Sequence, residues 1–195
     1  NLSPKFVWLE AEDFDDARVI IKDNLSQLSD KNQWQIYLKA LGQIGFKKYV
    51  KERNPTIKIK QDNSANLIDD VSFLWINDFR LCLIIFDNLV DNLIIVPNKL
   101  ITSAEIAAHF YVLLEVLEEE EKLNIYGFWR YDELFRYSQS LDFKSQPDEN
   151  FQLPLYLVDT ELNNLLLYTR FLKPSAITLF ALEDYRSRSV SPREK

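Results

Sequence analysis

Near the N-terminus, apolar residues recur every three or four positions, which is the spacing of one face of an α-helix. One such stretch runs from Glu10 to about Leu28, and a second starts near Asp30 and stops at Asn54-Pro55. Carboxylates crowd the first turns of the first stretch and basic residues crowd the last turns of the second, as the helix dipole favours. We therefore predict an N-terminal helical hairpin over about residues 10–53.

Beyond Pro55, short runs of β-branched and aromatic residues alternate with polar segments, a pattern typical of strands and turns. The runs cover residues 57–60, 71–76, 79–86 and 93–96. The short polar connection Asn77-Asp78 favours pairing of the two strands beside it. These runs predict a meander of adjacent antiparallel strands.

The stretch around the only histidine fits two structures. A capping-box pattern at Thr102 predicts a helix start, and the apolar positions that follow fit one helix over 103–121. The same positions fit a short helix over 103–108 and then a strand over 109–117. We favour the helix and strand because the β-rich run 123–129 requires a neighbour with which to pair.

Two further helices are indicated near the C-terminus. One starts at Asp132, and the other starts at Asp159 or Thr160 and ends at Pro174. The polar residues 145–150 predict a loop between the two helices.

Together these elements predict an α+β fold, in which the helical hairpin packs on an antiparallel meander sheet of about five strands and further helices follow the sheet. Curling of the sheet towards a small barrel stays open. We expect a single domain over residues 1–185, with the sheet over about 56–131 and the C-terminal helices over about 132–185. Residues 186–195 lack apolar periodicity and are expected to form a flexible tail.

The amino-acid composition argues against several classes of function. With only 3 glycines, the chain lacks the glycine-rich loops that hold nucleotide phosphates. A net charge of -7 disfavours nucleic acid and anionic membrane, which attract basic surfaces. One cysteine and one histidine fall short of the roughly four Cys and His ligands of a structural zinc site. We therefore expect no cofactor, no metal and no nucleic-acid partner.

The distribution of apolar residues also argues against a membrane protein. No run approaches the roughly 18 apolar residues of a transmembrane helix, and no signal-peptide pattern is visible. We expect a cytoplasmic protein without a membrane partner. Because the sequence starts at Asn1 and contains no methionine, we also expect a trimmed N-terminus or a fragment of a longer protein.

Three sequence blocks resemble a known family. The string AAHFYVLLEVLEEEEKLNIYGFWRYDEL, from Ala107 to Leu134, is the most recognisable of them. The strings WQIYLKAL, from Trp34 to Leu41, and FRLCLI, from Phe79 to Ile84, are the others. In this order they resemble the cyanobacterial family called domain of unknown function 1822, over most of residues 30–140. The resemblance implies a cytoplasmic protein of cyanobacterial origin and no activity, cofactor or catalytic residue.

Cys82 and His109 are the only residues that could form a thiol–imidazole pair. A cysteine nucleophile needs an exposed thiol of lowered pKa and a base within hydrogen-bonding distance. Cys82 lies inside the apolar run RLCLIIF, which favours a buried and inert thiol. We expect His109 to make a hydrogen bond with nearby backbone at the start of a strand.

Two groups of residues are candidates for binding a partner protein. A run of four glutamates, called here the glutamate tip, concentrates negative charge between two predicted strands. The second group joins an arginine to large aromatic residues, which are the residue types that anchor protein interfaces. The candidates are Glu118, Glu119, Glu120, Glu121, Trp129, Arg130, Tyr131 and Asp132. The alternatives are a solvated hairpin tip for the first group, and a core tryptophan beside an ion-paired arginine for the second.

The shortage of catalytic groups makes a non-catalytic protein-interaction or regulatory module our first hypothesis for the function. A small-ligand sensor with a pocket between helices and sheet is the second. A hydrolase that relies on carboxylates is the third, because 30 acidic residues offer many possible pairs.

Overall fold

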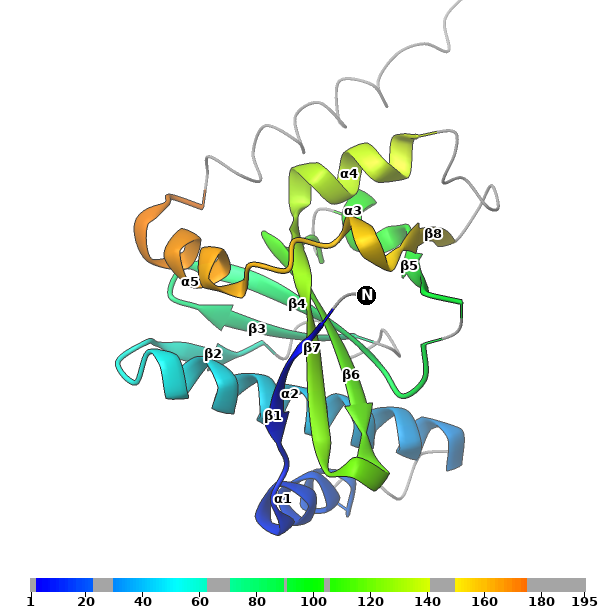
Figure 1. Cartoon of the computed structure of the whole chain (residues 1–195), viewed down its shortest axis with the longest axis vertical. Coiled ribbons are helices and arrows are strands. Elements are labelled where there is room, and N and C mark those ends of the chain that lie inside the picture. The colour runs from blue at the N-terminus through cyan, green and yellow to red at the C-terminus, as the bar shows by residue number, and fades with distance from the viewer. Residues whose placement is uncertain are drawn as a thin grey trace, which may run out of the picture.

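The computed structural model describes residues 3–22, 30–62, 71–89, 91–103, 106–140 and 150–174. Within this part of the chain it confirms the predicted α+β class, with helices packed on a curled sheet and further helices after the sheet (Figure 1). The predicted flexible tail over 186–195 lies outside the described residues, as does most of the predicted loop over 145–150. The single domain over 1–185 stays a prediction.

Six strands of the described chain form one sheet in the order β1-β7-β6-β4-β3-β2. They are β1 (Lys5–Trp8), β2 (Ile59–Gln61), β3 (Val71–Ile76), β4 (Phe79–Phe86), β6 (Phe110–Leu117) and β7 (Lys122–Arg130). Neighbouring strands are antiparallel except for β4 and β6, which run parallel with Leu81 opposite Phe110. The predicted meander is therefore interrupted at the centre of the sheet.

Strand β5 (Leu93–Pro97), which follows β4 in the chain, does not belong to the six-stranded sheet. It pairs with β8 (Asn150–Pro154) in a separate two-stranded sheet. A parallel pair of strands needs a long crossover connection, and the segment that contains β5 and α3 (Lys99–Thr102) supplies it between β4 and β6. An alternating pattern marks strands but does not specify their partners, so the sequence could not assign β5 to the second sheet.

Two local predictions are wrong at their boundaries. No described residue of the helix predicted over 103–108 is helical; the short helix α3 precedes it and ends at Thr102, whose hydroxyl donates to the Asn98 carbonyl at 3.0 Å. Strand β6 confirms the strand that the helix-plus-strand alternative predicted. The loop predicted over 145–150 ends early, because Asn150 already belongs to β8.

The helices cover both faces of the large sheet. They are α1 (Ala11–Lys22), α2 (Asp30–Arg53), α4 (Tyr131–Gln139) and α5 (Leu162–Phe171). As predicted, α1 and α2 pack against each other, and Figure 1 shows α2 passing behind β1, β6 and β7. The elements α3, α4, α5 and the β5–β8 sheet lie towards the end of the sheet that is farther from α1.

Two glycines bring α2 close to the sheet. A Cβ on Gly42 would lie 2.7 Å from Cδ1 of Ile85, and a Cβ on Gly45 would lie 2.7 Å from Cδ2 of Leu123. The backbone of α2 therefore packs directly on side chains of β4 and β7.

The central strands β4 and β6 are buried along nearly their whole length. Strands covered on both faces carry continuous apolar runs rather than alternating ones. This burial explains why RLCLIIF and FYVLLEVL show no alternation, and why FYVLLEVL also fits a helical pattern.

Strand β7 contains a bulge that re-aims its side chains. The register with β6 shifts between Leu113 and Leu114, so that Tyr126 is the extra residue. Next to it, Gly127 has φ +152, and a Cβ there would lie 2.2 Å from the Asp159 carbonyl oxygen. The glycine lets the segment at Asp159 approach and bridge to Phe128 through two backbone hydrogen bonds of 2.9 and 3.0 Å.

Candidate functional site

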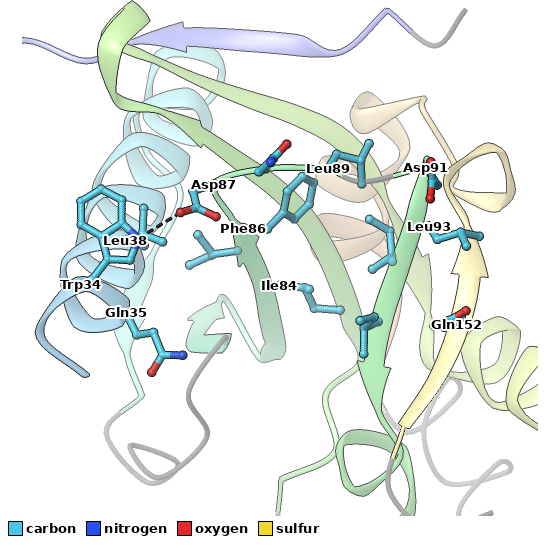
Figure 2. A pocket seen from close by; sticks show the side chains of 14 residues that line it. Trp34, Gln35, Leu38, Ile84, Phe86, Asp87, Leu89, Asp91, Leu93 and Gln152 are labelled. Carbon is cyan, nitrogen blue, oxygen red and sulfur yellow. Dashed lines mark hydrogen bonds between the residues drawn. The ribbon is translucent and has the colours of Figure 1, made fainter. Parts of the chain in front are cut away.

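An open cleft of about 490 Å³ lies where the N-terminal half of α2, the end of β4 and strand β5 meet (Figure 2). We call it the Trp34 cleft. Its apolar lining comes from Leu38 of α2, Ile84 and Ile85 of β4, and Ile94 of β5. Its polar lining residues are Gln35, Asp87, Asn88, Asp91 and Gln152. Apolar walls with a few polar groups are the usual composition of a binding site.

Trp34 stands at one side of this cleft with its side chain held in place. Its indole N–H donates to Oδ2 of Asp87 at 3.0 Å, and its ring packs beside Tyr37 at 5.6 Å between centroids. The residue keeps 40% of its surface exposed. A large aromatic ring that is both exposed and fixed can contact a ligand without losing much side-chain entropy.

Trp34 and Asp87 also border a second hollow of about 300 Å³. Its other lining residues are Val116, Leu117 and Glu118–Glu120. The carboxylates of Asp87 and of the tip therefore surround Trp34. Among the described lining residues of both hollows there is no Lys, Arg or His. The site accordingly carries a negative potential over an apolar floor.

The glutamate tip forms a turn at the end of the β6–β7 hairpin. Glu118–Glu120 make one turn of 3-10 helix, and Glu121 closes the turn in the left-handed conformation with φ 51. The Tyr37 hydroxyl donates to Oε1 of Glu118 at 2.8 Å, which ties the tip to α2. Glu119, Glu120 and Glu121 are exposed, so the hairpin tip is confirmed and its partner binding stays a prediction.

Burial raises the pKa of Tyr37 to about 12, with a further rise from the hydrogen bond to Glu118 and from its negative charge. The hydroxyl therefore stays protonated throughout the physiological pH range and remains a donor.

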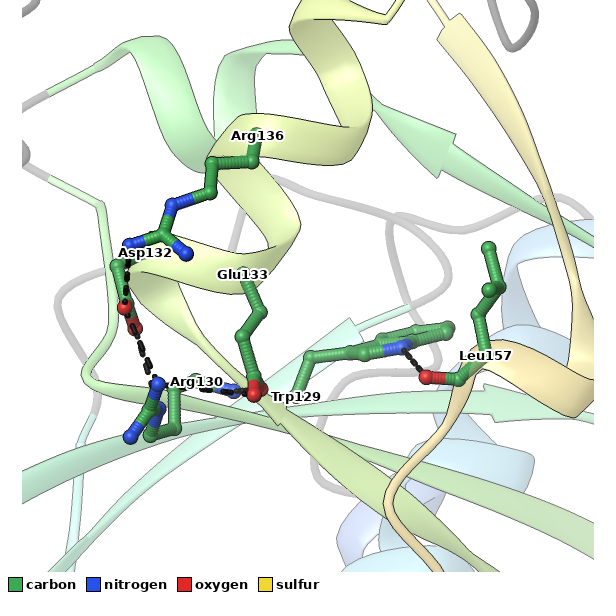
Figure 3. Close-up of polar contacts among 6 residues, drawn as sticks. All are labelled: Trp129, Arg130, Asp132, Glu133, Arg136 and Leu157. Atoms are coloured by element: carbon green, nitrogen blue, oxygen red, sulfur yellow. Dashed lines mark hydrogen bonds and ion pairs between the residues drawn. The ribbon is translucent and has the colours of Figure 1, made fainter.

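The second candidate group lies at the junction of β7 and α4 (Figure 3). Trp129 is buried, and its indole N–H donates to the Leu157 carbonyl at 3.0 Å. Tyr131 is also buried, and its hydroxyl donates to the Ile101 carbonyl. Both rings belong to the core, which agrees with the alternative of a core tryptophan rather than an exposed interface residue.

The charged members of this group form ion pairs with one another and with α4. Arg130 Nε lies 3.2 Å from Oδ1 of Asp132, and its Nη2 lies 3.6 Å from Oε1 of Glu133. Arg136 reaches Oδ2 of Asp132 at 3.5 Å (Figure 3). Glu133 also accepts a hydrogen bond from the Arg130 backbone N–H at 3.0 Å, which caps the start of α4. Arg130 and Asp132 remain partly exposed, and a partner could reach only these two of the group.

The surroundings of Cys82 and His109 indicate that both residues stabilise the fold. Burial raises the pKa of the Cys82 thiol, which is enclosed in the core. Burial also lowers the pKa of His109, whose Nδ1 accepts a hydrogen bond from the Arg80 backbone N–H at 2.8 Å. The histidine ring packs on the edge of Phe79. His109 thus bonds to backbone just before β6, as predicted, and remains neutral near pH 7.

No sequence pattern indicates the Trp34 cleft. Trp34 lies within the stretch that predicts a helix, and Asp87 directly follows the predicted strand over 79–86, so neither position stands out as part of a site. On β5, Leu93 and Ile95 are exposed while Ile94 and Val96 are buried, although all four are apolar. Only the pairing of β5 with β8 shows which of these side chains face outward.

The described residues place two limits on the site. They contain no group of three or more His, Cys, Asp or Glu side chains arranged to hold a metal ion. None of their helices combines the length and the apolar character required to cross a bilayer.

The fold and the cleft together define an α+β protein with an acidic, apolar-floored cleft. The chain matches the model of the family described as protein of unknown function (DUF1822) over residues 7–194, and it belongs to that family. No curated protein and no solved structure matches it.

Proposed function

We propose that this protein is a non-catalytic interaction or regulatory module, and that its Trp34 cleft binds an extended segment of a partner protein that carries both basic and apolar side chains. The carrying observation is the composition of the cleft. Carboxylates surround Trp34, the floor is aliphatic, and no described lining residue is basic. Cytoplasmic location and cyanobacterial origin are part of the same proposal.

The exposed side chains of β5 support a protein segment as the ligand. Leu93 and Ile95 are 40% and 58% exposed beside the cleft, and they extend its apolar surface along one strand. A segment lying across this strand would bury both side chains. Its basic residues would pair with Asp87, Asp91 and the glutamate tip.

Affinity selection of peptides from a random-sequence library against the whole protein tests this proposal. We expect enrichment of peptides in which Lys or Arg alternates with Leu, Ile, Val or Phe. Enrichment of acidic peptides, or of none, would contradict it.

Matched variants locate the binding. Asp91→Asn removes one charge at the cleft and keeps a residue type that tolerates the left-handed backbone found there, with φ 55. Asp16→Asn removes the same charge from the exposed surface of α1. We expect the first variant to weaken the selected peptides by at most about fivefold, as a partly exposed ion pair implies, and the second to have no effect.

A small-ligand sensor remains the second candidate, because the volume of the cleft lies within the range of roughly 300–1,000 Å³ that is usual for ligand pockets. It predicts a rise in melting temperature with one class of metabolite, since a ligand that binds only the folded state stabilises it. A flat response across a metabolite library would remove this candidate. No observation on the described residues favours a carboxylate-dependent hydrolase.

A further inference from the structure

A second surface lies on the face of the large sheet that is turned away from α2. Leu123 packs against α2, so its neighbour Asn124 points to the opposite face. Phe6 of β1 and Glu115 of β6 lie opposite Asn124, and Phe86 of β4 lies opposite Glu115. One row of side chains therefore crosses four strands, in the region where β1, β6 and β7 lie in front of α2 in Figure 1.

Aromatic rings dominate this row and its surroundings. Phe6 and Trp8 are 49% and 58% exposed and meet edge to face at 5.3 Å between centroids. Phe86 and Tyr126 stack at 6.1 Å, and the bulge in β7 supplies Tyr126 to this face. Lys122 Nζ lies 5.1 Å from the centroid of Phe6, so the ring already interacts with one ammonium group.

Glu115 lies between the two aromatic pairs and is only 8% exposed. Its Oε2 accepts hydrogen bonds from the Asn124 side-chain amide at 3.0 Å and from the Tyr126 hydroxyl at 2.7 Å. Its Oε1 accepts none from the described residues, and none of their basic side chains forms an ion pair with it. A carboxylate withdrawn from water without a cation is costly, so the structure leaves one negative charge to be matched.

Asn124 adds a second acceptor that lacks a donor. The residue is 6% exposed, and its Oδ1 is buried without a hydrogen-bond partner in the described structure. A native protein rarely leaves such an atom unpaired, because the lost hydrogen bonds with water are not replaced. The two free acceptors differ in access: Oδ1 of Asn124 is closed to solvent, whereas Oε1 of Glu115 still reaches solvent and can accept a hydrogen bond from a ligand.

We propose that this surface, made of Phe6, Trp8, Phe86, Glu115, Asn124 and Tyr126 and called here the Glu115 face, binds the primary ammonium group of a small alkylamine. The ammonium group supplies the positive charge that the Glu115 carboxylate lacks and an N–H donor for its Oε1. The aromatic rings contact the alkyl chain and the cation. The proposal does not depend on peptide binding in the Trp34 cleft, with which this face shares only Phe86.

Titration of the whole protein with n-butylammonium chloride, followed by NMR, tests the site. The signals to observe are the Asn124 side-chain amide and the Trp8 indole N–H. We expect both to shift with n-butylammonium and neither with 1-butanol, which has the same chain and no charge. Tetramethylammonium, which has the charge and no N–H donor, should bind more weakly. Equal shifts with 1-butanol, or no shift with n-butylammonium, would overturn the proposal.

Glu115→Gln should weaken n-butylammonium about tenfold or more, as the loss of a hydrogen bond to a charged group implies. Glu12→Gln on the exposed surface of α1 is the matched control and should leave binding unchanged. Phe6→Ala truncates a ring that is 49% exposed on the edge strand β1, and it should weaken binding even if Glu115→Gln fails to fold. Unchanged affinity in Phe6→Ala, or in a folded Glu115→Gln, would remove the site.

Discussion

Tyr37 links α2 to the glutamate tip through a single hydroxyl, and this one contact shows how a residue can be both structural and adjacent to a site. Its hydrogen bond to Glu118 fixes the tip beside Trp34, and its ring packs against the same tryptophan. The position of the glutamate tip beside the cleft therefore depends on Tyr37, for which the sequence predicted a place in a helix and no other role.

Replacement of Tyr37 by Phe tests this contact through the pH dependence of stability. The folded pKa of about 12 lies above the value of 10.0 expected in the unfolded chain, so the protonated hydroxyl favours folding. Its contribution is fully present below pH 10 and is lost as the pH rises to about 12. In urea titrations the unfolding free energy of the native protein should fall more steeply across this window than that of Tyr37→Phe. Parallel pH profiles would contradict the assignment.

Cys82 gives a second test at the same scale. Because burial raises the pKa of its thiol, the reactive thiolate is scarce in the folded protein. We expect a thiol reagent at pH 8 to label Cys82 only after denaturation, as mass spectrometry would show. Rapid labelling of the folded protein would reopen the possibility of a reactive thiol.

Among the elements, β7 has the strictest local requirement, at Gly127. A side chain there meets both an unfavourable positive φ and the Asp159 carbonyl oxygen, which is backbone and cannot swing aside. Gly127→Ala should lower the unfolding free energy by about 2–4 kcal/mol. Gly42→Ala is the comparison and should lose less, because its new methyl group meets side-chain atoms of Ile85 at 2.7–3.1 Å rather than backbone, and because its helix gains propensity. Equal losses in urea unfolding of the two variants would refute this reason.

Some of the helices and strands could be predicted from the sequence and others could not. The helical hairpin, the pair of strands β3 and β4, and the β6–β7 hairpin with its glutamate tip follow from periodicity and turn residues, which act between near neighbours. The parallel pairing of β4 with β6, the departure of β5 and the edge strand β1 depend on contacts between distant residues. For the same reason, the glutamate tip could be predicted and the Trp34 cleft could not, since Trp34 and Asp87 are 53 positions apart.

At the scale of the whole molecule, the net charge is -7, and the carboxylates of Asp87, Asp91 and the glutamate tip line the hollows beside Trp34. A basic peptide in the cleft should therefore bind more weakly as salt is added. We expect about a tenfold rise in Kd between 0.1 and 1 M salt, where the Debye length falls from about 10 to 3 Å. Isothermal titration calorimetry checks this dependence, and a Kd that does not change with salt would show that the carboxylates are irrelevant.

The pairing of β5 with β8 also sets an order of events during synthesis. Strand β5 ends at Pro97, whereas its partner begins at Asn150. At about 5–20 residues per second, the ribosome needs roughly 3–10 s to make the intervening chain. Throughout that interval β5 has no sheet in which to pair, and one wall of the cleft is missing. The Trp34 cleft of the nascent protein is therefore completed late, after the core strands β4, β6 and β7 have already emerged.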